Sequence, residues 1–174
     1  MRKLLFINLW TVLMLVNISC EKTEGFTSLT DSISELPVAV TNVYDYLPAP
    51  TVKASKAENK ITITLQLPAE AGRTIKEVTK IAVAGTASYG PIHNGTIVGR
   101  GANQLWSNTP VPVNASTYTF TTTFTEAQAK SPTALGLTWP AASNALLGMD
   151  FYFQFKLDND QLVIPSYVRV FVVD

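Results

Sequence analysis

The chain has a single histidine, which makes it the first candidate for acid–base chemistry. His93 lies in residues 89–95, a stretch with two glycines and a proline that indicates a loop. A catalytic histidine needs a nucleophile and an orienting carboxylate beside it. The sequence has no Gly-x-Ser-x-Gly turn that would supply the nucleophile. We therefore expect a loop histidine, and we predict a protein that is not an enzyme and has no catalytic residue.

Acidic side chains suggest two further kinds of chemistry. The Asp-Asn-Asp run at 158–160 carries oxygen ligands for Ca²⁺, but a calcium loop needs more ligands, so the run is typical of an exposed hairpin turn. A glycosidase needs two carboxyl groups about 5–9.5 Å apart across a cleft. Nothing in the local sequence pairs Glu70, Glu77 or Glu126. With one histidine and one cysteine, we expect no metal site and no cofactor.

Aromatic residues in stretches that indicate loops are the best candidates for ligand binding. They are Tyr89, Trp106 and Trp139. An exposed planar ring matches the C–H face of a pyranose and can stack on it. The alternative is that Trp106 and Trp139 fold back over the ends of the domain and belong to its core.

The only cysteine, Cys20, follows a short cationic segment and an apolar run at 4–18. At about 15 residues this run is shorter than the roughly 20 residues of a membrane span, and it is typical of a secretory signal. With Ser19 before the cysteine, the segment resembles a bacterial lipoprotein signal, although Asn17 stands where leucine is usual. The resemblance implies cleavage before Cys20 and lipidation of Cys20. The alternatives are an ordinary signal peptide and an N-terminal membrane anchor.

The residues after Cys20 and the charge of the chain bear on location and partners. Glu21, Lys22 and Glu24 resemble the signals that send lipoproteins of the Bacteroidota to the outer face of the outer membrane. We therefore expect a lipid-anchored protein of a bacterial outer membrane, on the cell surface. The whole chain has 13 basic and 13 acidic residues, which argues against nucleic-acid binding driven by net charge.

The sequence divides into three parts. Residues 1–19 are the predicted lipoprotein signal peptide, and residues 20–49 are the predicted lipidated cysteine and flexible tether, rich in Thr, Ser and acidic residues. Within the tether, residues 38–40 and the pair Tyr44 and Tyr46 are expected to dock on the domain as a short strand or a cover. Residues 50–174 are the predicted folded domain.

The folded domain shows the period-two pattern of half-buried strands. The clearest alternation is Ile61, Ile63, Leu65 and Leu67 against polar neighbours. We also predict strands at 74–83 and 116–125, followed by a helical turn at 125–130. Two antiparallel hairpins are expected: an opening one from 51–55 and 61–67, and a terminal one from 149–157 and 162–173.

The opening and closing strands look like those of an immunoglobulin or fibronectin type III-like module over residues 50–174. The resemblance implies an all-β, antiparallel β-sandwich of about seven strands. The whole layout is similar to small surface lipoproteins of the Bacteroidota. We expect a non-enzymatic protein that acts in binding or assembly, with the membrane as one partner and a glycan or another envelope protein as the other. The alternatives are a carbohydrate-binding accessory lipoprotein of a polysaccharide uptake system and a fimbrial-type structural subunit.

Overall fold

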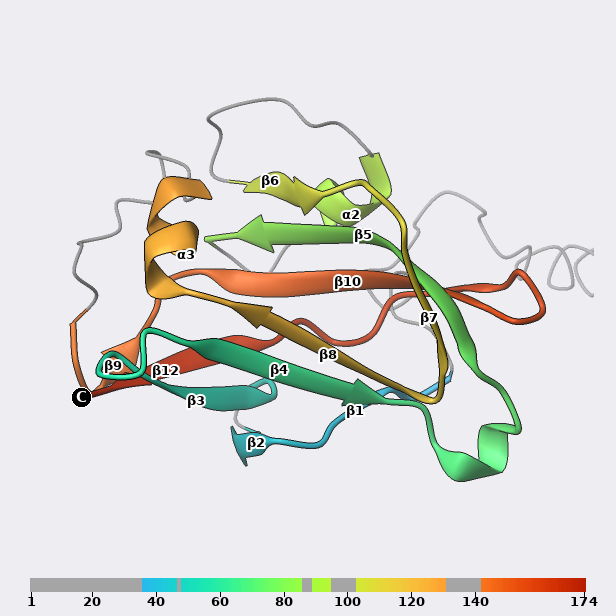
Figure 1. Cartoon of the computed structure of the whole chain (residues 1–174), viewed down its shortest axis with the longest axis horizontal. Helices are drawn as coiled ribbons and strands as arrows, with labels where there is room; N and C mark the ends of the chain where they lie inside the picture. The colour runs from blue at the N-terminus through green and yellow to red at the C-terminus, as the bar shows by residue number, and fades with distance from the viewer. Residues whose placement is uncertain (1–35, 47, 86–88, 95–102, 131–141) are drawn as a thin grey trace, which may run out of the picture. The chain divides into compact units, whose positions relative to one another are not determined.

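The computed structural model describes residues 36–46, 48–85, 89–94, 103–130 and 142–174. All of these belong to the unit Ser32–Asp174, whereas the unit Met1–Asp31, with the predicted signal and Cys20, lies outside the described residues. The described part consists mainly of strands arranged in layers (Figure 1). This confirms the prediction of an all-β sandwich.

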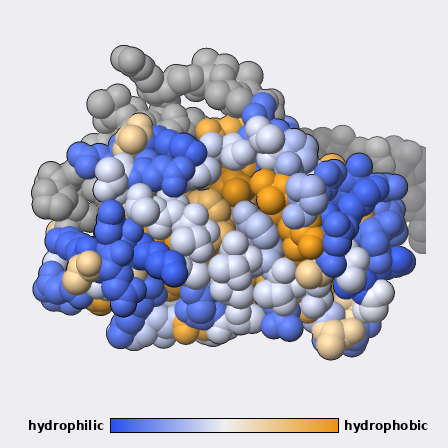
Figure 2. Space-filling view, viewed as in Figure 1, coloured by the Kyte–Doolittle hydropathy of each residue, from blue (hydrophilic) through white to orange (hydrophobic). Residues whose placement is uncertain are grey.

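The first layer is a three-stranded antiparallel sheet in the order β1-β4-β8. Its strands are β1 (Ala39–Val40), β4 (Ile61–Gln66) and β8 (Thr117–Thr122). In β4, the side chains of Ile61, Ile63 and Leu65 are buried and the threonines between them face outwards, as the alternation predicted. Figure 2 shows that the face over β4 and β8 is mostly pale, neither strongly polar nor strongly apolar.

The second layer contains two sheets that meet at an isolated bridge between Phe151 and Val168. The first sheet has the order β11-β10-β5-β6, and β7 also pairs with β5. Its strands are β5 (Ile75–Ala84), β6 (Asn103–Ser107), β7 (Val111–Ala115), β10 (Asp150–Leu157) and β11 (Leu162–Val163). The second sheet has the order β2-β3-β12-β9. Its strands are β2 (Val43–Asp45), β3 (Thr51–Ser55), β9 (Ala145–Leu146) and β12 (Arg169–Val173).

Short helices accompany the strands. They are α2 (Gly90–Asn94), α3 (Phe124–Lys130) and a 3-10 turn, η3 (Ala69–Ala71). The α3 helix confirms the helical turn predicted at 125–130. It starts there because the Thr123 hydroxyl accepts a hydrogen bond from the Glu126 N–H at 3.0 Å, which satisfies a backbone donor that the helix itself leaves unpaired.

Aromatic side chains fill the space between the layers. The Phe120 ring of β8 lies 5.5 Å from the Phe151 ring and 5.6 Å from the Phe153 ring of β10, measured between centroids. Tyr118 lies 6.3 Å from Phe153 and 6.0 Å from Phe155 in edge-on contacts. Such pairs contribute about 0.5–1.5 kcal/mol each beyond the burial of their area. The core therefore holds the two layers together without a disulfide.

The prediction of an opening hairpin was wrong. Strands form at 51–55 and 61–66, but β3 lies in the second layer and β4 in the first. The turn between them ends at Asn59, whose φ of 49° suits the small polar asparagine. The physical reason is that Val52 and Ile63 both point into the common core, each from its own layer.

The predicted terminal hairpin forms only in part. On the side away from β5, strand β10 pairs with the two-residue β11, loses this pairing around Pro165, which has no N–H to donate, and pairs with the returning chain again at the Phe151–Val168 bridge. After Val168 the chain crosses to the other sheet. Strand β12 then runs parallel to β3, with Arg169 opposite Thr51 and Val173 opposite Ser55. This is the one parallel pair among the described strands.

The segment 36–46 belongs to the sandwich. Strand β1 pairs with β4, and β2 pairs with β3. The docking predicted for residues 38–40 as a short strand is therefore confirmed, and the paired strands begin before residue 50.

Candidate functional site

Trp106, predicted as an exposed ligand-binding ring, is a core residue. Only 8% of it is exposed, and its ring packs against Phe120 at 5.9 Å and Phe151 at 5.6 Å. The cause is a register shift: Ser107 pairs with Ile81 and Leu105 with Ala82, so Trp106 is the extra residue of a bulge. The alternative that Trp106 folds back on the domain describes its position, and this ring has no free face for a sugar.

Tyr89 is buried as well, on the opposite side of the same sheet. It is 9% exposed and packs edge-on against Tyr152 at 5.3 Å. Its hydroxyl accepts a hydrogen bond from the Tyr167 N–H at 3.3 Å. Burial raises the pKa of the Tyr89 phenol. Tyr89 therefore joins α2 to the sheet and cannot serve as an exposed stacking ring.

Two other predicted residues cannot be placed. Trp139, the third ligand-binding candidate, and Cys20, the predicted lipidation site, both lie outside the described residues.

The acidic run at 158–160 forms the predicted turn, between β10 and β11. The Asp160 carboxylate lies 2.9 Å from the Lys76 ammonium and 3.4 Å from that of Lys156. The hydrogen bond from Lys76 is the main reason that the pKa of Asp160 is lower than usual. Within the described ranges, no group of three or more His, Cys, Asp or Glu side chains could hold a metal ion. His93 is exposed at the end of α2.

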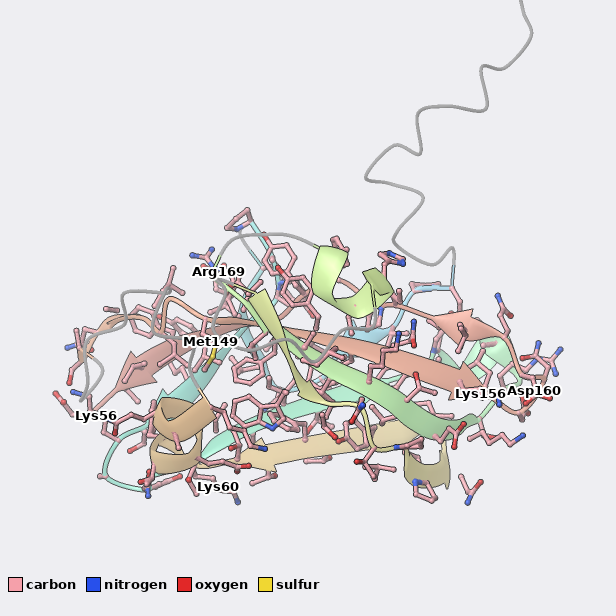
Figure 3. All side chains as sticks on the ribbon, turned by 90° about the horizontal axis from the view of Figure 1, so that it is seen from above. Lys56, Lys60, Met149, Lys156, Asp160 and Arg169 are labelled. Atoms are coloured by element: carbon pink, nitrogen blue, oxygen red, sulfur yellow. The ribbon has the colours of Figure 1, made fainter. Side chains whose placement is uncertain are left out.

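A pocket of about 490 Å³ lies where the two sheets of the second layer meet. Its apolar lining residues include the exposed Pro48 and Leu146 and the buried core residues Leu147, Met149 and Val170. Its polar lining comes from Asp150, Tyr167 and Arg169. Figure 3 shows Met149 and Arg169 at one end of β10, far from Lys156 and Asp160 at the other.

Asp150 and Arg169, the two charged residues of this pocket, lie opposite each other on neighbouring segments of the chain. Because Phe151 and Val168 form an antiparallel bridge, Asp150 and Arg169 are the next opposed pair, and their side chains emerge on the same face. Burial raises the pKa of Asp150 to about 6, and the positive charge of Arg169 opposes this rise. With both groups ionised, the charges of Asp150 and Arg169 cancel, and among the described residues of the lining no other side chain is charged.

An exposed aromatic strip runs from β2 to the rim of this pocket. We define the aromatic strip as Tyr44, Lys53, Phe171 and Leu146, one residue from each strand of the β2-β3-β12-β9 sheet. The Tyr44 ring, 54% exposed, lies 5.8 Å from the Phe171 ring, with the Lys53 ammonium 3.9 Å from the Tyr44 centroid. Phe171 is opposite Leu146, which lines the pocket. Exposed rings therefore exist, on strands rather than in the predicted loops.

Sequence reasoning missed the pocket because its polar residues are outward positions of two ordinary strands. The alternation places Asp150 and Arg169 on the outer face, and the predicted terminal hairpin sets their segments side by side, but neither shows that Pro48, Gly85 and Leu146 gather around them to form a pocket. A charged residue at the first position of an otherwise aromatic strand was the only local signal.

Comparison of the chain with models of protein families, with curated proteins and with solved structures finds no match. Among the described residues, no helix has the length and apolar character needed to cross a bilayer.

Proposed function

We propose that this protein is a non-enzymatic, lipid-anchored protein of a bacterial outer membrane that acts in binding or assembly through its β-sandwich. The observation that supports the anchor is the place of Cys20, the only cysteine of the chain. It directly follows the small residue Ser19, at the end of an apolar run of about 15 residues, which is a usual length for a signal peptide. Each buried CH₂ of an acyl chain contributes about 0.8 kcal/mol, so several chains on Cys20 hold a folded domain at a membrane. The likeness in layout to surface lipoproteins of the Bacteroidota supports a position on the cell surface.

Acylation is tested by metabolic labelling of cells that express the full chain with radioactive palmitate. We expect label in the wild type and in the control Ser19→Ala, which keeps a small residue before the cysteine, and none in Cys20→Ala. Globomycin, which inhibits the lipoprotein signal peptidase, should cause the precursor to accumulate. A wild-type protein without label, or equal labelling of Cys20→Ala, would rule out the anchor. Protease treatment of intact cells then tests exposure at the surface.

A second candidate, assembly of subunits by strand addition, is supported by the free edge of β8. Within the described part of the chain, β8 pairs with β4 alone. The Leu67 N–H donates to the Ser116 carbonyl at 2.8 Å, so every second residue of β8 bonds to β4 and the backbone groups of Thr117, Thr119 and Thr121 point the other way. The strand has six residues and no charge, the kind of edge that accepts another strand.

The other described edges are less suited to strand addition. Strands β1, β2, β9 and β11 have only two or three residues. Strand β7 carries Pro112, and β6 has a bulge at Trp106. In Figure 1, β8 is the outermost strand of its sheet, and Figure 2 shows apolar side chains beside it on the same face.

Strand addition is tested by size-exclusion chromatography and electron microscopy of the purified full chain in detergent. We expect concentration-dependent oligomers or filaments in the wild type and their loss in Thr119→Lys, because a charge on the free edge opposes pairing. Thr64→Lys is the matched control, since Thr64 lies opposite Thr119 on the same face but in the central strand. A wild-type protein that stays monomeric at every concentration would exclude this candidate.

A further inference from the structure

The pocket and the aromatic strip lie on one continuous face of the molecule. Arg169 and Phe171 are two residues apart on β12, so their side chains emerge on the same side. Asp150 shares that side through the bridge at Phe151, and Leu146 through its pairing with Phe171. Tyr44 extends the surface by its ring contact with Phe171. A ligand in the pocket can therefore continue along the strip.

The chemistry of this surface limits the class of ligand. The carboxylate of Asp150 accepts hydrogen bonds and the guanidinium of Arg169 donates them, so a ligand group between them has to do both, as a hydroxyl does. At the pocket itself the charges of Asp150 and Arg169 cancel, which disfavours a strongly charged ligand there, and Lys53 adds one positive charge beside Tyr44. The exposed Leu146 side chain at the rim of the pocket and the exposed Tyr44 residue favour apolar C–H faces on the ligand.

We propose that the pocket at Asp150 and Arg169, together with the aromatic strip, binds a neutral saccharide. A pyranose presents neighbouring hydroxyls that bond to an acid and a base at once, and a C–H face that stacks on an aromatic ring. A pocket of about 490 Å³ falls in the range of 300–1,000 Å³ that is usual for small-ligand sites. One sugar unit occupies the pocket, and the next units lie along Phe171 and Tyr44.

This inference rests on the proposed role in binding, but it does not depend on the lipid anchor. The test is isothermal titration calorimetry with the purified full chain in detergent at pH 8, where the Asp150 carboxyl is ionised. The probes are cellohexaose, maltohexaose and mannohexaose as neutral saccharides, and hexagalacturonate as the anionic comparison. We expect at least one neutral hexasaccharide to bind and hexagalacturonate to bind at least tenfold more weakly.

Four variants locate the site. Arg169→Gln and Asp150→Asn should each weaken binding at least tenfold, since each removes one charge of the pair and so replaces a charge-assisted hydrogen bond to the sugar hydroxyl with a weaker neutral one. Tyr44→Ala, at a position that is 54% exposed, should weaken binding about threefold to tenfold. Lys156→Gln is the matched control, because it removes a cation from the same layer at its other end (Figure 3), and it should bind as the wild type does.

Several results would overturn the proposal. They are the absence of binding to all three neutral probes, tighter binding of hexagalacturonate, and unchanged binding in both Arg169→Gln and Tyr44→Ala. Because the palmitate experiment measures acylation alone, a labelled protein that binds no saccharide would disprove this inference and leave the anchor intact. An unlabelled protein that binds a saccharide would do the reverse.

Discussion

The Asp150 carboxyl group lies in a partly desolvated site. Asp150 begins β10, the strand whose next five residues are all buried, and it lines the pocket. Burial disfavours the charged form, and Arg169 compensates for this only in part, so the pKa rises from 3.8 to about 6. A carboxyl group with this environment titrates in a pH range where ordinary aspartates stay ionised.

The stability of the protein should therefore depend on pH through Asp150. The folded protein binds this proton more tightly than the unfolded chain, so the stabilisation is complete below about pH 4 and is lost as the pH rises through about 6. We expect Asp150→Asn, which cannot ionise, to raise the free energy of unfolding by about 1–2 kcal/mol at pH 8, after a reduction for solvent screening. At pH 4 the variant and the wild type should be nearly equal.

Urea unfolding between pH 4 and pH 8 measures this difference. Glu58→Gln, at an exposed turn position, is the control for removal of a carboxylate. A gap between Asp150→Asn and the wild type that stays constant across this pH range would show that the Asp150 carboxyl is not desolvated.

At the scale of elements, the crossing of the chain from one layer to the other is held by a side chain. The backbone of the β1 segment makes its last bond to β4 from the Thr41 N–H, which donates to the Thr64 carbonyl at 2.9 Å, and the Asn42 side chain continues the ladder. The Asn42 side-chain amide donates to the Thr62 carbonyl at 2.8 Å and accepts from the Thr64 N–H at 2.9 Å. A side chain thus imitates a peptide group of a strand while the backbone continues to β2 in the other layer.

Loss of the Asn42 amide should weaken the attachment of the segment between β1 and β2 to β4. We expect Asn42→Ala to lower the free energy of unfolding by about 1–2 kcal/mol, because two backbone groups of β4 lose their partners. Asn42→Asp keeps the acceptor and loses the donor, so it should show a smaller effect. Amide hydrogen exchange at Thr41, whose N–H donates to the Thr64 carbonyl, and at Thr64 should speed up in the same order, and equal exchange in all three proteins would contradict the role given to Asn42.

At the scale of the whole described domain, the β11-β10-β5-β6 sheet is covered on both faces. Its inner face packs on the first layer, and its outer face carries a second cluster beneath α2. Tyr152, Ile92 and Ala82 of this cluster are fully buried, and the Lys80 ammonium donates to the Ile92 carbonyl at 3.2 Å. The sandwich therefore has a third, partial layer.

This cover makes both faces of β10 part of the core. We expect Tyr152→Ala to lower the free energy of unfolding by about 3–5 kcal/mol, as much as Phe153→Ala, although the two side chains point in opposite directions. Lys156→Ala, on the outer face near the exposed end of the strand, should cost no more than about 1 kcal/mol. Urea unfolding of the three variants checks this, and a Tyr152→Ala value close to that of Lys156→Ala would mean that α2 does not cover the sheet.

The sequence by itself determined where most of the predicted strands lie and, for a strand with one polar face such as β4, which side faces the core. The alternations at 61–67 and 116–125 predicted β4 and β8, because side chains on a strand point alternately to its two faces. The helical turn after β8 and the acidic turn at 158–160 were predicted from the residue types of those short segments. The signal and the lipidation of Cys20 also rest on local sequence, and they stay predictions.

Only the tertiary structure decided which strands are neighbours, and with them the pocket. Period two gives a strand an inner face but does not assign it to a layer, so β3 and β4 were predicted as a hairpin although they lie on opposite sides of one core. A bulge turned Trp106 inwards, and after Val168 the chain left β10 to pair with β3 and β9, which brought Leu146 to the pocket that Asp150 and Arg169 line. These outcomes depend on contacts between residues far apart in the chain. A local sequence pattern carries no information about such contacts.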